Sequence, residues 1–337
     1  MPTFTSSRYT VSAATISANT SLTALRNAML QVRPDHAQLT GGWASIEDAG
    51  SNLRVSNAAP PVSDPELWDD EGDYPERLVA RFYFFRRDAQ LVRALPQGSE
   101  QEHHYLDAVD VIVSAVPERT KTFQVLFASG NGSMLNGFVR ALRALVADID
   151  EKGTVRHDGA AIGFNPDLFL WLLVRAREDK QIDPSTEIQD VLATSARDNT
   201  RRSTMLSDGV DFDRPTFLVA VAEIDQLGPV RVVLRDEELK AKITTDVFAG
   251  GKFSVRKRET HYQDVVGDPE TRLASLQDFA YLLLPKVIAA YNADTSWPTV
   301  RRTAEIRAAA QSLIARYEQK IADFDAANAA AALDADG

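Results

Sequence analysis

The sequence predicts a mixed α+β protein with a strand-rich N-terminal part, a mostly helical C-terminal part and a long C-terminal helix. Runs of β-branched and aromatic residues lie mainly before residue 130. Apolar residues at three- and four-residue steps dominate after residue 165, and the segment from Val300 to Phe324 keeps this spacing longest. We therefore predict a strand-rich domain over residues 1–150, a helical domain over 151–325 and a disordered tail over 326–337.

Three segments of the N-terminal part have the composition of strands. They are Arg77–Arg86, Tyr105–Val116 and Thr122–Ala128. Before them, Ser21–Val32 has helical spacing and is followed by Pro34, while residues 1–20 form either a loose arm or an edge strand. The prolines and acidic residues of Val55–Glu76 indicate an exposed loop.

A glycine-rich turn, Gly130-Asn131-Gly132-Ser133, joins the third predicted strand to a helical pattern that includes Leu135 and Phe138. Backbone N–H groups at such a helix start can bind an anion. The turn lacks the Lys-Ser/Thr pair of a phosphate-binding loop, and Ser133 is not in a G-x-S-x-G setting. A plain tight turn is the simpler interpretation.

The C-terminal part contains four predicted helices before the last one, each with a start signal. They begin at Asn165-Pro166-Asp167, at Glu187 after Asp183-Pro184-Ser185, at Asp213 with Pro215, and at Asp268-Pro269-Glu270. The first is apolar on nearly all sides through Val174, so we expect it in the core. The second, Glu187–Ala196, has a weaker pattern. The fourth runs to about Tyr291, and Pro285 should kink it or end its first half.

A small antiparallel meander is predicted at about 230–262, from the strand-like runs Val230–Leu234, Ile243–Phe248 and Phe253–Arg258. If Gly250-Gly251 forms a two-residue loop, Phe248 faces Phe253.

On that register Lys252, Ser254, Arg256 and Arg258 share one face, because strand side chains alternate. The three cations of this face form a basic cluster together with Lys257. A second basic cluster, Arg201-Arg202, lies in a polar linker. We expect these lysines and arginines to bind nucleic acid or an acidic protein partner.

Charge and motifs favour a non-catalytic binding component of a larger assembly. A formal net charge of -11 argues against wholesale coating of nucleic acid, but it allows a local basic surface. No complete catalytic constellation is visible, so an enzyme is the less favoured interpretation, and we expect no cofactor.

The alternative function is a metal-dependent nuclease or other hydrolase, because Glu238-Leu239-Lys240 matches the Glu-x-Lys of restriction-type nucleases. Such an enzyme needs a further acidic residue, for which Glu223 and Asp225 are the candidates. His103-His104 with Asp107 and Asp110 offers four potential ligands, but surface histidines at a strand start explain them more simply, so no metal site is predicted.

The chain has no cysteine, and its first residues lack a basic segment followed by an apolar run. The most apolar window, Leu168–Val174, is far shorter than the roughly 20 residues that span a bilayer. A soluble cytoplasmic protein without a membrane partner is the default expectation.

The C-terminal helix suggests a third function, a structural oligomer, which is compatible with the first. Its apolar stripe over Ile306–Phe324 is narrow and is flanked by charged residues and alanines. Such a stripe fits docking along one groove better than burial in a core. The groove belongs either to the same chain or to a second copy, and packing within the chain is the simpler of the two.

Overall fold

The computed structural model describes residues 8–335 except 47–52, 57–62, 70–71, 117–118, 158–165, 198–202, 207–213, 223–225, 249–251 and 265–273. It confirms the α+β class. The chain divides into two compact units. Unit 1 comprises Met1–Phe164 and Asp236–Pro285, and unit 2 comprises Asn165–Arg235 and Lys286–Gly337. The first division falls between Phe164 and Asn165, and a later segment of the chain returns to unit 1. The predicted domain boundary at residue 150 stays a prediction.

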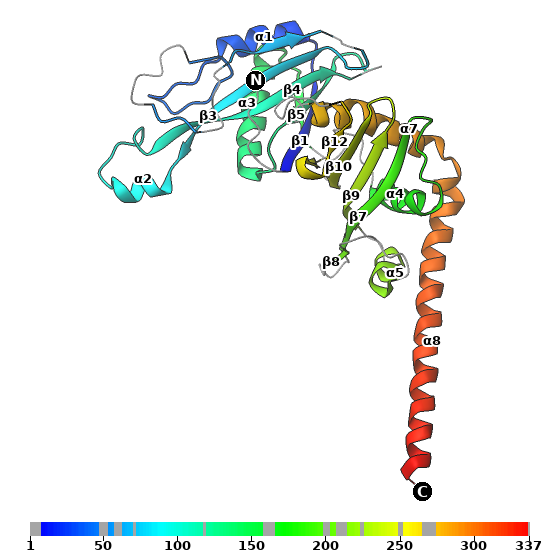
Figure 1. The fold of residues 1–337 in the computed structure, drawn as a ribbon. Coiled ribbons are helices and arrows are strands. Elements are labelled where there is room, and N and C mark those ends of the chain that lie inside the picture. The colour runs from blue at the N-terminus through cyan, green and yellow to red at the C-terminus, as the bar shows by residue number, and fades with distance from the viewer. Residues whose placement is uncertain are drawn as a thin grey trace. The chain divides into compact units, whose positions relative to one another are not determined.

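An antiparallel sheet forms the body of unit 1 (Figure 1). Its strand order is β2-β3-β4-β5-β1-β11-β10, with β6 paired to β1 and β12 paired to β10. The strands are β1 Arg8–Ser17, β2 Glu66–Trp68, β3 Arg77–Arg87, β4 His104–Ala115, β5 Thr122–Phe127, β6 Thr154–Arg156, β10 Ala241–Phe248, β11 Lys252–Arg256 and β12 His261–Tyr262. The three strands predicted before residue 130 are therefore confirmed as β3, β4 and β5.

Helices α1 and α3 pack against this sheet through a continuous apolar core. The helices of unit 1 are α1 Leu22–Gln31, α2 Ala89–Ala94 and α3 Gly132–Ile149. Ser21 caps α1 by accepting a hydrogen bond from the Ala24 N–H. Phe138 of α3 stacks on Phe127 of β5 with ring centroids 4.1 Å apart. Pairs of large buried aromatic rings such as this one dominate core stability.

Strand β1 corrects one expectation, because it is neither a loose arm nor an edge strand. It lies between β5 and β11 and pairs with both. Ala13 and Ala14 are consecutive and both are buried, so both faces of the strand are covered. Small residues fit such a position, which is why the alternation of polar and apolar residues typical of half-exposed strands is missing. Within the predicted loop Val55–Glu76, the short strand β2 pairs with β3.

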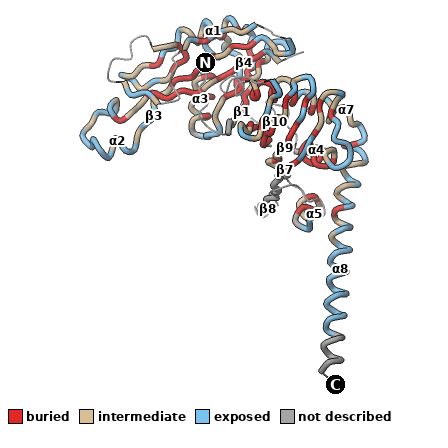
Figure 2. The backbone as a smooth tube through the Cα atoms, in the orientation of Figure 1, coloured by how far each residue is buried: buried red, intermediate tan, exposed pale blue. Residues whose placement is uncertain are grey.

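Unit 2 combines a small sheet with helices. Strands β9, β7 and β8 are ordered β9-β7-β8, and β7 pairs with β8 in the antiparallel sense. The elements are α4 Pro166–Glu178, β7 Thr186–Arg197, β8 Ser203–Leu206, α5 Pro215–Ala222, β9 Gln226–Asp236, α7 Leu284–Ala293 and α8 Arg302–Ala335. The last residue of β9 and the first two residues of α7 belong to unit 1. Every residue from Leu168 to Val174 is buried, so α4 is the predicted core helix (Figure 2).

The helix predicted over Glu187–Ala196 is wrong, because this segment is strand β7. Asp183 accepts hydrogen bonds from the N–H groups of Ser185 and Thr186 and so stabilises a turn at the start of β7. Thr186 and Ile188 are buried on either side of the partly exposed Glu187. Pairing with β8 and β9 decides between the two structures, and β9 is distant enough in sequence that local periodicity does not report it.

Pro285 interrupts a helix at the predicted place. A π-helical turn, Asp278–Leu283, directly precedes α7, of which Pro285 is the second residue. Because proline has no N–H to donate to the preceding turn, the helix changes its hydrogen-bond pattern there. The predicted start of this helix, Asp268-Pro269-Glu270, lies outside the described residues.

Helix α8 is longer than predicted and runs from Arg302 to Ala335, after a π-helical turn over Trp297–Arg301. Helical structure therefore continues into residues 326–337. The disorder of that tail in solution stays a prediction.

Candidate interaction site on the C-terminal helix

The predicted basic hairpin is largely built into the sheet of unit 1. Strand β11 lies between β1 and β10, and Phe248 of β10 is opposite Lys252, one residue from the predicted register. The Lys252 Nζ donates to the carbonyl oxygen of Gly130 at 3.0 Å. Arg256 pairs with Asp246 at 3.0 Å and with Glu259 at 3.3 Å. Both cations therefore interact with acceptors of the same chain.

The remaining predicted cations do not continue the stripe on β11. The strand ends at Arg256, and Lys257 and Arg258 belong to the 3₁₀ turn Lys257–Glu259, where Arg258 is exposed. Arg201 and Arg202 lie outside the described residues. Binding of nucleic acid or an acidic protein at this hairpin stays a prediction, with Arg258 as its most accessible cation.

The residues of the nuclease hypothesis occupy a turn. Glu238 and Lys240 lie between β9 and β10, and the Lys240 Nζ pairs with Asp264 at 3.0 Å. Glu223 and Asp225 are outside the described part of the chain. In that described part, no group of three or more histidine, aspartate and glutamate side chains is placed to hold a metal ion.

The paired histidines have separate partners. His103 is buried with its Nε2 2.7 Å from the Leu95 carbonyl oxygen, and the His104 Nδ1 is 2.6 Å from that of Glu100. Asp107 accepts from the Ser56 hydroxyl, and Asp110 pairs with Arg81. These four side chains therefore serve local contacts.

The apolar stripe of α8 is the largest group of exposed apolar side chains among the described residues. Its four main members are exposed by 56–67%: Ile314 57%, Tyr317 56%, Ile321 61% and Phe324 67%. They recur at three- and four-residue steps and so lie on one face of the helix. We name them the α8 stripe. A contiguous exposed apolar surface of this kind marks an interaction site.

The first turns of α8 are packed, in contrast with the rest of the helix. Helix α5 contacts α8, and Ala309 is buried. From Gln311 to Asn328 every residue is exposed except the half-buried Leu313, and α8 extends past the other elements of unit 2 (Figures 1 and 2). A helix without tertiary packing is marginally stable in water. The exposed half therefore has the properties of a helix that is completed by a partner.

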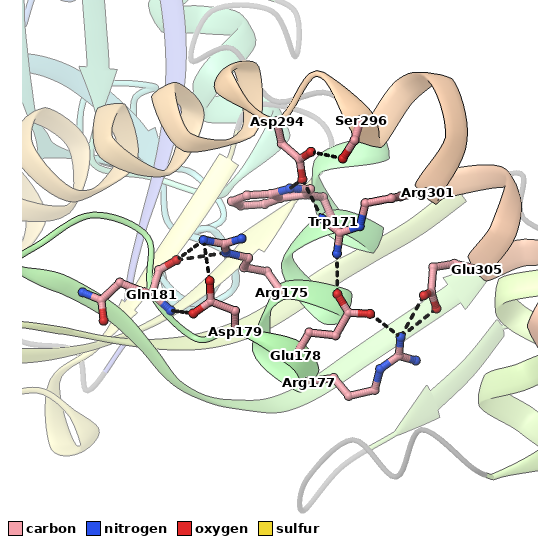
Figure 3. Close-up of polar contacts among 10 residues, drawn as sticks. All are labelled: Trp171, Arg175, Arg177, Glu178, Asp179, Gln181, Asp294, Ser296, Arg301 and Glu305. Carbon is pink, nitrogen blue, oxygen red and sulfur yellow. Dashed lines mark hydrogen bonds and ion pairs between the residues drawn. The ribbon is translucent and has the colours of Figure 1, made fainter.

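Ion pairs fix the base of α8 to α4 (Figure 3). The Arg177 guanidinium donates to both carboxylate oxygens of Glu305 at 2.9 Å. Arg301, just before α8, pairs with Glu178 of α4 and with Asp294 at 2.9 Å. A network of several charges holds its members better than isolated surface pairs do. The start of α8 is thus set firmly on unit 2.

Asp294 joins this network to the core. It accepts hydrogen bonds from the Trp171 indole N–H at 3.1 Å and from the Ser296 hydroxyl at 2.6 Å. Partial burial alone would raise the pKa of Asp294, but these hydrogen bonds and the Arg301 charge outweigh it and hold the pKa below its usual value. The carboxylate is therefore ionised at neutral pH, and Arg302 adds a parallel pair to Asp167 at 2.8 Å.

Sequence reasoning found the α8 stripe but missed its anchor. Arg301-Arg302 is visible as a basic cluster, and the structure places both beside acidic residues. Their partners Asp167 and Glu178 are far away in the chain, and Asp294 lies just before α8. The network therefore cannot be predicted from the spacing of residues in the sequence.

Charges are unevenly distributed along α8 beyond its anchor. The basic residues Arg307, Arg316 and Lys320 all precede Ile321. Most of the acidic ones follow it, and the full set is Glu318, Asp323, Asp325 and Asp334. The helix therefore has a basic first half and an acidic second half.

No protein-family model matches this sequence, and no curated protein is significantly similar to it. Among the described residues, no helix has the length and apolar character needed to cross a bilayer.

Proposed function

We propose that this protein is a non-catalytic binding component of a larger assembly, and that two copies pair through their α8 stripes. The exposure of Ile314, Tyr317, Ile321 and Phe324 on one face of a firmly anchored helix carries this proposal. The proposal favours the oligomer over packing of α8 within its own chain, because the stripe lies beyond the contact with α5.

The spacing of the stripe supports a second copy as its occupant. The steps from Ile314 to Tyr317, Ile321 and Phe324 are three, four and three residues, so they read the same in both directions. A two-fold axis near Gln319 would place Ile314 opposite Phe324 of the other copy, and Tyr317 opposite Ile321. Self-complementary surfaces of this kind form isologous dimers.

Charge supports an antiparallel arrangement of the two helices. Antiparallel pairing sets the basic first half of one α8 against the acidic second half of the other, whereas parallel pairing sets like halves together. The two helix dipoles also oppose each other favourably in this orientation.

The expected affinity is moderate. Full burial of one large apolar side chain contributes about 1.5–3 kcal/mol, and association of two proteins costs about 4–15 kcal/mol. With only four partly exposed side chains on each copy, the free energy gained by burial exceeds the cost of association by a small amount. We therefore expect a dissociation constant on the order of micromolar or weaker.

A charge placed within the stripe tests the proposal. In sedimentation equilibrium, the full chain should show a concentration-dependent mass that rises from 37.1 kDa toward twice that value. Tyr317→Asp should weaken the dimer, because it brings a carboxylate into the apolar contact.

Arg316→Asp provides the matched control, since residue 316 lies about 120° around the helix from the centre of the stripe. If Tyr317→Asp and Arg316→Asp weaken association equally, pairing through the stripe is wrong. A mass of 37.1 kDa at every concentration would contradict self-association itself.

A further inference from the structure

A buried arginine in unit 1 lacks a counter-ion. Arg77, the first residue of β3, is 3% exposed and forms no ion pair with a carboxylate among the described residues. Its Nη1 donates to the Gln277 side-chain oxygen at 2.7 Å, and its guanidinium lies 4.8 Å from the Tyr74 ring centroid. Because arginine stays charged, burial without an opposite charge is costly.

Four buried polar atoms around this guanidinium have no hydrogen-bond partner in the described structure. They are Arg77 Nε, Gln277 Nε2, Ser114 Oγ and Tyr281 Oη. Ser114 is directly opposite Arg77 in the register of β3 and β4, and Gln277 is bonded to Arg77. Tyr281 lies in the π-helical turn Asp278–Leu283, a type of helix defect that is frequent at functional sites.

The Tyr281 hydroxyl interacts with the same groups. Burial raises the pKa of Tyr281 to about 12, while a side-chain hydrogen-bond interaction with Ser114 and the Arg77 charge act in the opposite direction. The phenol therefore stays protonated at neutral pH and retains a hydrogen to donate. Three elements, β3, β4 and the helix before α7, thus contribute to one cluster.

The neighbouring carboxyl of Asp278 is engaged elsewhere. Asp278 accepts hydrogen bonds from the Tyr74 and Tyr262 hydroxyls, the latter at 2.5 Å. Burial raises the pKa of this carboxyl, and the two tyrosine hydrogen bonds only partly offset that effect. Tyr74 therefore contacts both groups: its hydroxyl donates to Asp278 while its ring faces the Arg77 guanidinium.

The donor chemistry of the cluster identifies the kind of ligand that it lacks. Arginine Nε and the glutamine amide nitrogen only donate, and both hydroxyls can donate. We propose that Arg77, Ser114, Gln277 and Tyr281 bind a small oxyanion, a phosphate or a carboxylate group. Such an anion would neutralise the guanidinium and accept hydrogen bonds from all four orphan atoms.

Calorimetric titration of the full chain with inorganic phosphate, and separately with acetate, tests this site. At least one of the two anions should bind saturably in a background of constant sodium chloride. Arg77→Met should raise its dissociation constant at least about tenfold, because hydrogen bonds to a charged group are lost. Arg87→Met is the matched control, since Arg87 ends the same strand with a 57% exposed side chain. It should bind the anion as the parent does.

A second variant keeps the test valid if Arg77→Met fails to fold. Tyr281→Phe removes only one hydroxyl and leaves the ring in place, so the fold should tolerate it, and anion affinity should fall several-fold. The proposal is overturned if neither anion binds the parent beyond the sodium chloride background. It is also overturned if Arg77→Met and Arg87→Met bind the anion equally well, or if Tyr281→Phe binds it as tightly as the parent.

Discussion

Replacing Ile321 with Asp should convert the protein to a monomer at concentrations where the parent is a dimer. Ile321 is 61% exposed and lies near the centre of the α8 stripe. The substitution removes the apolar contact and brings a carboxylate into an apolar interface. Each change occurs twice in a symmetric dimer, so the dissociation constant should rise by more than about 100-fold. Sedimentation equilibrium measures the effect directly.

The same substitution away from the stripe provides the control. Ala315→Asp adds the same charge to an exposed position on the far side of α8, so it should leave the dimer intact. Far-ultraviolet circular dichroism should also show less helix in Ile321→Asp than in Ala315→Asp, because an unpaired α8 frays more readily. Equal masses for both variants and the parent would show that the stripe is not the interface.

The largest expected effect on stability lies in unit 1, at the ion pair between Arg81 and Asp110. The two residues are opposite each other on β3 and β4, their side chains are 3% and 16% exposed, and the Arg81 Nε is 2.8 Å from the Asp110 carboxylate. Asp110→Ala should lower the free energy of unfolding by about 3–5 kcal/mol, because the buried Arg81 guanidinium loses its ion pair with Asp110. Urea-induced unfolding measures this change.

The pair itself need not be strongly stabilising. Burial raises the pKa of Asp110 more than the neighbouring Arg81 lowers it. A carboxyl whose pKa is higher in the folded state than in the unfolded state stabilises the fold most at pH values below its unfolded-state pKa. This stabilisation is lost as the pH rises through the folded-state pKa. The double variant Arg81→Met with Asp110→Ala should therefore cost much less than Asp110→Ala alone. A double variant as unstable as the sum of the two single ones would contradict this account.

Local sequence signals predicted most elements of the fold. Strands β3, β4 and β5 carry dense β-branched and aromatic residues, and α1 has regular apolar spacing with Pro34 just beyond its end. The core helix α4 was evident from its continuous apolar run. In these segments intrinsic preference and tertiary packing agree, so a local pattern is sufficient.

The errors arose where distant pairing decides the structure. Glu187–Ala196 forms β7 because of its partner strands, and β1 is central because both of its faces are covered. The buried cluster around Arg77 is equally invisible in sequence, since its members come from residues 77, 114, 277 and 281. Only the α8 stripe could be identified from spacing, because its members share one helix.

Disulfide trapping tests the antiparallel α8 pair most directly, because the natural chain has no cysteine. Two single variants, Ile314→Cys and Phe324→Cys, are mixed and oxidised in a glutathione buffer. Residues 314 and 324 of one helix are about 15 Å apart, and a disulfide requires Cα atoms within about 7 Å. Antiparallel pairing predicts that the mixed disulfide between the two variants forms in preference to either symmetric one. Preferential formation of the symmetric disulfides would show that the helices are parallel, and no enrichment of any species would contradict pairing through α8.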